Sequence, residues 1–399
     1  MENKFILVIN CGSSSIKFSL IAPHNGQEPL SGIAQNLLTE QANITFKLNG
    51  EKIKQDLPSP FVHHTALSHI VHFLQQNKFS DQVVAVGHRV VHGGERYSEP
   101  TLINDDVMAT LEQLSHLAPL HNPANITGIT AAQQAFSALP QVAVFDTAFH
   151  QTMPAMAYLY ALPYELYQKH GIRRYGFHGT SHYYVSRQAT RLLNLPESTG
   201  SFISAHLGNG ASICAIENGK SVDTSMGLTP LSGVVMGTRS GDVDPGIIFH
   251  LINSLGYSHQ QVNDLLNKDS GLLGLSKLSN DCRAIEEAIL NDNNQQAKLA
   301  LDIFCYRIAK QIAAYTASLT SLDGIIFTGG IGENSDYVRQ QVVSFLSVLN
   351  LVIDNTLNIQ TRFGKAGNIA TADSRPVLVI PTNEELVIAQ QTAEVTQTL

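Results

Sequence analysis

The sequence predicts an α/β protein of two domains, and three observations lead to this prediction. The chain has 399 residues, more than twice the ~150 residues of a typical domain. Strand-like and helix-like segments alternate along it, which is typical of α/β folds. A strand-turn-strand pattern rich in Gly and Ser begins each half of the chain, and such an internal repeat indicates duplication.

The first strand-turn-strand pattern comprises a β-type run at residues 5–9, the turn NCGSSS at 10–15 and a second alternating run at 16–20. The second comprises residues 201–205, the turn HLGNGAS at 206–212 and residues 213–216. Tight turns of this composition direct several N–H and hydroxyl groups into one concavity, which binds anions. Two such turns at duplicated positions favour phosphate binding over ordinary hairpins, although neither matches a Walker or Rossmann motif.

The remaining segments continue the alternation. Residues 83–87 and 141–145 are strand-like, residues 105–117 are compatible with a helix, and apolar residues recur at helical spacing over 297–320, with Cys305 in the core. A buried-type strand at 324–328 then ends in a glycine-rich loop at 329–334. Because ligands bind at the carboxyl ends of strands in open α/β sheets, we expect a nucleotide at this loop.

Composition and charge exclude several classes of partner. Acidic residues outnumber basic ones by 33 to 25, which leaves a net charge of -8 and argues against binding to nucleic acid or an anionic membrane. The four cysteines lie far apart without CxxC spacing, so they indicate neither a disulfide framework nor a zinc module. With no signal-peptide or membrane-spanning pattern in the sequence, we expect a cytoplasmic protein.

Polar side chains follow the predicted strands, where phosphoryl transfer would need them. Arg89 and Asp146 follow the strand-like runs at 83–87 and 141–145, and His178 and Arg239 lie in the glycine-containing segments 175–182 and 236–244. Each residue alone has an ordinary structural explanation. Their position near glycine-rich turns favours a common site for phosphate.

His178 and His182 are four residues apart, so they would suit a zinc site on one helix face. Gly179 interrupts the pair, however, and the HExxH pattern is absent. Thr180 or Ser181 is predicted as the N-cap of the following helix, which assigns His182 to the structure and leaves His178 to point elsewhere.

The sequence resembles the acetate kinases, a family within the superfamily of acetate and sugar kinases, 70-kDa heat-shock chaperones and actin. The resemblance covers essentially the whole chain and rests on many motifs in order. They are NCGSSSIKF at 10–18, GHRVVHGG at 87–94, LHNP at 120–123, FDTAFH at 145–150, YGFHGTSH at 175–182, HLGNG at 206–210, MGTRSGD at 236–242, GGIGEN at 329–334 and TNEEL at 382–386.

The resemblance implies two duplicated actin-like (ribonuclease H-like) domains with a nucleotide cleft between them. It implies domain I at residues 1–149, completed by a C-terminal helix at 384–399, and a nucleotide-binding domain II at 150–383. The implied reaction is the reversible, Mg-dependent in-line transfer of the ATP γ-phosphoryl group to acetate, giving acetyl phosphate and ADP. Propionate kinase is the alternative within the family, and a homodimer is typical of it.

The family pattern also implies the ligands of the metal and the nucleotide. Asn10 and Glu384 match the positions that hold Mg²⁺, or Mn²⁺ in its place, and oxygen ligands are what Mg²⁺ prefers. Nucleotide contacts are implied in both turns, in the loop at 329–334 and in the tripeptide 281–283, which by itself looks like a surface loop. These positions are Ser13, Ser15, Lys17, His206, Leu207, Gly208, Asn209, Gly210, Asp281, Cys282, Arg283, Gly330, Ile331, Gly332, Glu333 and Asn334.

Four further residues match catalytic positions of the family. Arg89 is assigned to the substrate carboxylate, and His178 and Arg239 are assigned to the transferring group, because fixed cations stabilise the charge on its oxygens. Asp146 matches the catalytic carboxylate. A carboxylic acid substrate is already ionised at pH 7, so we expect Asp146 to orient an arginine or hold a magnesium-bound water instead of acting as a base.

The family's acyl pocket matches four apolar positions in this chain. Such a pocket would enclose a methyl group tightly and make propionate a poorer substrate, because one methylene is worth about 1–3 kcal/mol. The positions are Val91, Leu120, Phe177 and Pro230.

Two other classes of function stay open. An actin-like ATPase or chaperone would hydrolyse ATP without any carboxylate, but it would give no reason for Arg89, His178 and Arg239 to converge on a small acid. A hydrolase would use His178 and His182 with a metal ion.

Overall fold

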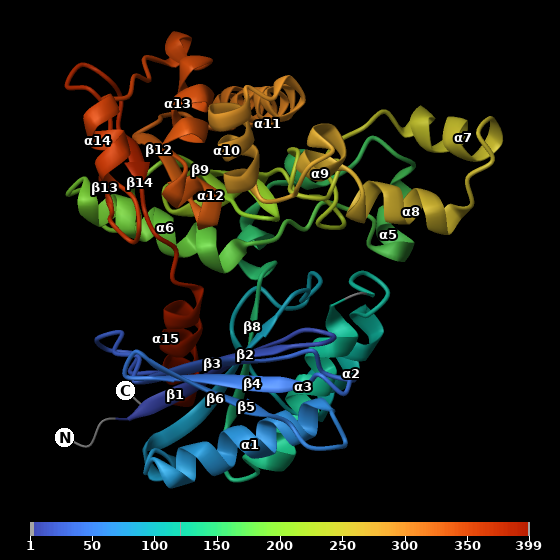
Figure 1. Cartoon of the computed structure of the whole chain (residues 1–399), viewed down its shortest axis with the longest axis vertical. Helices are drawn as coiled ribbons and strands as arrows, with labels where there is room; N and C mark the ends of the chain where they lie inside the picture. Colours follow the sequence, from blue (N-terminus) through green and yellow to red (C-terminus); the bar gives the residue numbers. More distant parts are fainter. Residues whose placement is uncertain (1–3, 120, 398–399) are drawn as a thin grey trace. The chain divides into compact units, whose positions relative to one another are not determined.

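The computed structural model describes residues 4–119 and 121–397, and the backbone divides into two compact units (Figure 1). Unit 1 comprises the chain up to Ala148 together with the segment from Asn383 onward, and unit 2 comprises Phe149–Thr382.

Unit 1 is built on an eight-stranded sheet in the order β5-β4-β3-β2-β1-β6-β8-β7. Side chains alternate along β1, so Phe5, Leu7 and Ile9 pack with α1 and α3 on one face, whereas Ile6 and Val8 pack with α15 on the other. The strands are β1 Phe5–Cys11, β2 Ile16–Ile21, β3 Leu30–Gln35, β4 Asn43–Leu48, β5 Glu51–Asp56, β6 Val83–Val90, β7 Thr101–Leu102 and β8 Gln141–Phe145. The helices are α1 His63–Gln76, α2 Asp105–Leu114, α3 Asn122–Ala135 and α15 Glu384–Thr396.

Unit 2 is built on a six-stranded sheet in the order β11-β10-β9-β12-β14-β13, against which α6 and α11 pack. The strands are β9 Phe202–Leu207, β10 Ala211–Glu217, β11 Lys220–Thr224, β12 Gly324–Thr328, β13 Gly367–Asn368 and β14 Val377–Val379. The helices are α4 Ala155–Tyr158, α5 Tyr164–His170, α6 Gly179–Leu192, α7 Pro245–Asn253, α8 His259–Lys268, α9 Gly271–Ser276, α10 Cys282–Asp292, α11 Gln295–Tyr315, α12 Gly329–Asn334, α13 Asp336–Ser344 and α14 Asn355–Gln360.

The two sheets share one arrangement of five strands. In unit 1 the order β3-β2-β1-β6-β8 has two antiparallel pairs followed by two parallel pairs. In unit 2 the order β11-β10-β9-β12-β14 repeats this pattern of directions. The predicted internal repeat therefore corresponds to two structurally equivalent sheets, each beginning with a hairpin.

Both predicted hairpins are confirmed, with turns at residues 12–15 and 208–210. The helix predicted at 297–320 is α11, and Cys305 is fully buried in it. None of the helices in the described part of the chain combines the length and the apolar character needed to cross a membrane.

Two local predictions were wrong. The predicted loop at 329–334 is the short helix α12, because the Glu333 side chain turns back and accepts a hydrogen bond from Gly329 N–H at 2.9 Å. The predicted N-cap at Thr180 or Ser181 is also wrong, since α6 begins at Gly179 and its N-cap is His178 in the left-handed conformation (φ 57°). The Ser181 hydroxyl contacts His206 Nδ1 at 2.8 Å instead of capping the helix.

Candidate active site

Unit 1 gathers four of the predicted residues at one edge of its sheet. β1, β6 and β8 are parallel neighbours, so Asn10, Arg89 and Asp146 all lie near their carboxyl ends. Glu384 begins α15, which packs against the same three strands. The local sheet order alone therefore brings together residues that are distant in the sequence.

Arg89 is the centre of this group. Its Nε donates to Asp146 Oδ1 at 3.0 Å and its Nη2 donates to Asp146 Oδ2 at 2.5 Å, which makes the pair bidentate. Its Nη1 lies 3.4 Å from Asn10 Oδ1, and Glu384 Oε2 lies 4.0 Å from its Nε. The Asp146 side chain is 1% exposed and that of Arg89 is 23% exposed, so a buried carboxylate holds a guanidinium that solvent can reach.

The electrostatics of the group agree with this geometry. Burial acts to lower the pKa of Arg89, but the Asp146 and Glu384 carboxylates outweigh it and raise that pKa, so the guanidinium stays charged. Burial raises the pKa of Glu384, although Arg89 acts in the opposite direction. A cation beside Glu384 would therefore stabilise its ionised form, which burial disfavours.

Asn10 and Glu384 fit the role of magnesium ligands that the resemblance implies. Both supply oxygen atoms within reach of one guanidinium, and Mg²⁺ typically takes only one or two protein ligands and keeps several waters. The described residues contain no cluster of three or more His, Cys, Asp or Glu side chains that could hold a metal ion alone. A two-residue site completed by phosphate and water is the arrangement these donors can support.

Unit 2 brings His178, His206 and Arg239 around the turn between β9 and β10. The rings of His178 and His206 stack with centroids 4.2 Å apart. A methyl group built on Gly210 would lie 3.5 Å from Arg239 Nη1 and 3.6 Å from His178 Nε2. The backbone of Gly210 therefore lies beside both nitrogens with no side chain between, which suits the close approach of a phosphate.

Arg239 is held by neutral groups. Its Nη1 donates to Pro230 O at 3.2 Å, and within the described residues it pairs with no carboxylate. Burial lowers its pKa, but guanidinium remains charged at physiological pH. A half-buried cation without an anionic partner favours binding of an anionic ligand.

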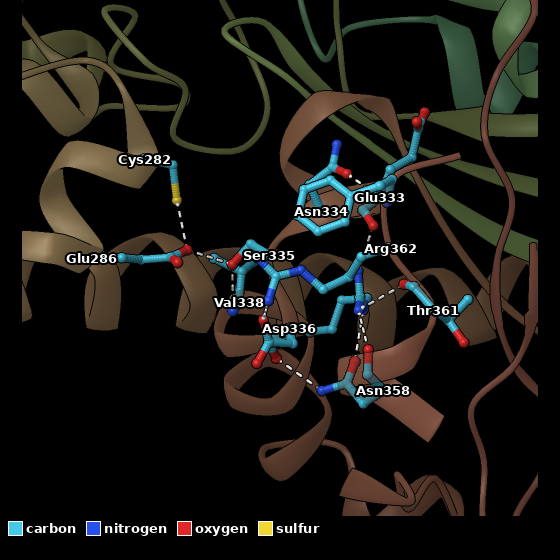
Figure 2. A network of polar contacts seen from close by, with 12 residues as sticks. Cys282, Glu286, Glu333, Asn334, Ser335, Asp336, Val338, Asn358, Thr361 and Arg362 are labelled. Atoms are coloured by element: carbon cyan, nitrogen blue, oxygen red, sulfur yellow. Dashed lines mark hydrogen bonds and ion pairs between the residues drawn. The ribbon is translucent and has the colours of Figure 1, made fainter. Parts of the chain in front are cut away.

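Further predicted nucleotide residues lie on α10 and α12, which a polar network connects (Figure 2). The Cys282 thiol donates to Glu286 Oε1 at 3.3 Å, and Ser335 Oγ donates to the same oxygen. Ser335 is also the N-cap of α13, which follows α12 directly. The network thus links the helix that begins after Asp281 to the end of the GGIGEN segment.

Two of these residues are not available as side-chain ligands. The Cys282 side chain is buried, and burial raises its pKa, so any contact from this residue would come from its main chain. Glu333 Oε1 accepts hydrogen bonds from Gly329 N–H and Thr382 N–H within the unit. Asp281 caps α10 by accepting from Arg283 N–H at 3.0 Å. Gly330, by contrast, has no atom near a Cβ position and lies open.

The remaining predicted residues are divided between the units. Ser13, Ser15 and Lys17 lie in or beside the β1–β2 turn, where Ser13 and Lys17 are exposed. Val91 is buried in unit 1, and Phe177 is buried in unit 2. Leu120 lies outside the described residues.

Sequence reasoning missed Ser212, whose Oγ lies 2.9 Å from His178 Nδ1, and Asn280, which donates to Asn209 Oδ1 at 2.9 Å. It also missed Arg339, a fully buried arginine that donates to the carbonyls of Gly332 and Glu333 at the end of α12. The pairing of Ser212 with His206 across β9 and β10 could have indicated a shared face. No comparable sequence pattern points to Asn280 or Arg339.

Comparison with known proteins gives one consistent result. The model of the acetokinase family matches residues 5–390. Curated acetate kinases from Shewanella sp. strain ANA-3 and Shewanella oneidensis are 55% and 54% identical over 392 residues, covering 98% of each chain. These matches confirm the family that the motifs predicted.

Solved structures agree. A propionate kinase from Francisella tularensis is 47% identical with a TM-score of 0.93, and an acetate kinase from Porphyromonas gingivalis is 43% identical with a TM-score of 0.92. Each alignment covers 98% of this chain and 100% of the other. The predicted α/β fold class is confirmed.

Proposed function

The chain belongs to the acetokinase family, and we propose on this basis that it transfers the γ-phosphoryl group of ATP reversibly to acetate, forming acetyl phosphate and ADP. The structural observation that supports this best is the bidentate Arg89–Asp146 pair. Asp146 occupies Nε and Nη2 of the guanidinium, and Nη1, which donates one N–H to Asn10 Oδ1 at 3.4 Å, has a second N–H for a small carboxylate. Asp146 thereby acts on Arg89 and is not needed as a base, since acetate is already ionised at neutral pH.

Unit 2 supplies the groups for the phosphates. Arg239 and His178 lie beside Gly210 and stabilise the charge that spreads over the phosphoryl oxygens in a loose transition state. Asn10 and Glu384 would hold Mg²⁺, which would supply positive charge to neutralise the phosphates. Because fixed donors need no rearrangement during the reaction, this stabilisation requires no covalent intermediate.

Propionate is the alternative substrate. The similarity of this chain to the propionate kinase from Francisella tularensis is the reason to retain it. The two acids differ by one methylene, which an apolar pocket discriminates by about 1–3 kcal/mol. Val91, a buried residue two positions after Arg89, is one of the four pocket residues that set this preference.

We also propose that the chain forms a homodimer in the cytoplasm. The apolar helix α7 has no buried residue, and Ile247 and Phe249 on it are 43% and 64% exposed, so a second copy would cover them. All four cysteines are free thiols, which a reducing compartment maintains. Light scattering after chromatography tests the dimer, and Phe249→Asp is expected to yield monomer.

The first experiment measures acyl phosphate trapped with hydroxylamine in the presence of ATP and Mg²⁺. Formate, acetate, propionate and butyrate are compared with a control without acid. Highest turnover with acetate supports the proposal, and highest turnover with propionate transfers it to the alternative. ATP hydrolysis without any acyl phosphate would refute both and favour an actin-like ATPase.

A further inference from the structure

Three buried side chains form a hydrogen-bonded chain that ends at His178. Ser204 Oγ lies 2.5 Å from His182 Nδ1, His182 Nε2 lies 2.8 Å from Ser212 Oγ, and Ser212 Oγ lies 2.9 Å from His178 Nδ1. Ser204, His182 and Ser212 are all 0% exposed. All three side chains are therefore shielded from solvent.

The fold explains why these groups meet. Cys214 pairs with Ser204 and Ser212 pairs with His206 across β9 and β10, and alternate residues of a strand share a face. Ser204 and Ser212 therefore lie on one face of the sheet. Helix α6 packs on β9 and carries His182 in its first turn, directly after its N-cap His178.

The available protons determine which atom donates in each hydrogen bond between Ser204 and His178. Burial lowers the pKa of His182 well below the usual value, so the ring is neutral and has one donor and one acceptor nitrogen. Ser204 Oγ has no hydrogen-bond partner other than His182 among residues 4–119 and 121–397. Its buried hydroxyl proton must therefore be donated to His182 Nδ1, because leaving it unpaired is costly.

The remaining protons follow in order. Since His182 Nδ1 accepts, His182 Nε2–H donates to Ser212 Oγ, and the Ser212 hydroxyl then donates to His178 Nδ1. His178 Nδ1 is thus an acceptor, and a neutral His178 carries its proton on Nε2. That nitrogen lies 3.6 Å from a Cβ built on Gly210, and Arg239 Nη1 lies 3.5 Å from the same point.

We propose that Ser204, His182 and Ser212 are positioning residues that hold His178 as the Nε2–H tautomer, so that it donates a hydrogen bond to the transferring phosphoryl group. This inference rests on the proposed function for its catalytic consequence, although the tautomer itself does not depend on it. It assigns His178 the role of a neutral donor beside the charged Arg239. For His178 Nε2 to act as a base, each hydrogen bond between Ser204 and His178 would have to be donated in the opposite direction.

The test combines spectroscopy with kinetics. Two-bond ¹⁵N–¹H spectra of the ¹⁵N-histidine-labelled full chain distinguish the two tautomers and the imidazolium, and the His178→Gln variant identifies the His178 signals. Ser204→Ala is the decisive substitution, because Ser204 does not contact His178. Ser186→Ala is the matched control, because this buried serine of α6 donates only to the backbone, at Tyr183 O.

The wild type is expected to show Nε2–H at His178 without any substrate at neutral pH. Ser204→Ala is expected to produce a mixture of tautomers and to lower kcat by about tenfold, a fraction of the 10²–10³ that loss of a whole transition-state donor costs. The KM for ATP should change less than twofold. Ser204→Thr, which keeps the hydroxyl, should restore the tautomer, and Ser186→Ala should alter neither tautomer nor kcat.

An Nδ1–H tautomer or an imidazolium at His178 in the wild type would overturn the inference, even if every serine variant failed to fold. A folded Ser204→Ala protein with an unchanged tautomer and an unchanged kcat would also overturn it. Absence of acyl phosphate formation by the wild type would instead refute the proposed function, and the tautomer measurement would keep its meaning.

Discussion

Replacing Asp146 by Asn should lower kcat/KM for acetate by about 30- to 160-fold, the equivalent of about 2–3 kcal/mol. The substitution keeps the size of the side chain but removes its charge. Arg89 would then be held less firmly, and its other carboxylate neighbour, Glu384 at 4.0 Å, would compete for it. The guanidinium is expected to move away from the orientation that binds substrate.

The magnitude follows from two hydrogen bonds. Arg89 donates through Nε at 3.0 Å and through Nη2 at 2.5 Å to the two oxygens of Asp146. An Asn side chain keeps one acceptor and presents an NH₂ group to the other N–H. Each hydrogen bond to a charged group contributes about 1.5–3 kcal/mol. Because Arg89 is 23% exposed, we discount the loss of one bond and the weakening of the other to about 2–3 kcal/mol.

The assay is hydroxylamine trapping of acetyl phosphate over a range of acetate concentrations and pH values, with thermal unfolding to confirm the fold. Asp106→Asn is the matched control, because Asp106 pairs with Arg96 at 2.6 Å where both side chains are more than half exposed; less than a twofold change is expected. Wild-type kcat/KM in Asp146→Asn would refute the orienting role. Loss of the acidic limb of the pH profile in Asp146→Asn would show that Asp146 acts as a base, because a general base must be deprotonated to act.

Three further predictions follow from buried groups. Val91→Ala should narrow the preference for acetate over propionate by up to about tenfold, because one methylene is worth about 1–3 kcal/mol. Glu384→Gln should raise the Tm at pH 7 without Mg²⁺, because burial raises the pKa of Glu384 and its ionisation opposes folding above its usual pKa. The free energy of unfolding should fall as the pH drops from about 6.5 to about 4, because burial lowers the pKa of His88 to about 4 and the unfolded chain binds its proton first.

Each of these has a defined contrary result. An unchanged ratio of kcat/KM for the two acids would remove Val91 from the acyl pocket. If Mg²⁺ raises the Tm of Glu384→Gln as much as that of the wild type, Glu384 is not a metal ligand. His88→Gln should flatten the dependence of unfolding free energy on pH, measured by urea titration, and an identical slope would assign that dependence to other groups.

The sequence predicted the elements that local patterns determine, and the site residues that end strands. Arg89 and Asp146 follow apolar runs at 83–87 and 141–145 that are recognisable in isolation. Arg89 itself lies within the last residues of β6, and parallel pairing brings the two strand ends together. The relation of Ser204 and Ser212 to His182 depends on which sheet face α6 covers, and no local pattern determines that. No motif of the sequence singled out Arg339, which is fully buried and donates to the carbonyl of Gly332 in α12.

The packing of α15 on the sheet of unit 1 constrains how the protein folds during synthesis. Ile388, Ala389 and Ala393 of α15 complete the cluster that buries Ile6 and Val8. During synthesis at about 5–20 residues per second, this face of the sheet lacks the cover of α15 until residues 384–396 have left the ribosome. This apolar face of the N-terminal sheet therefore stays exposed, and accessible to chaperones, while the whole of unit 2 is translated. Deletion of α15, which begins at Glu384, would expose the apolar face of β1, which ends at Cys11 near the opposite end of the sequence.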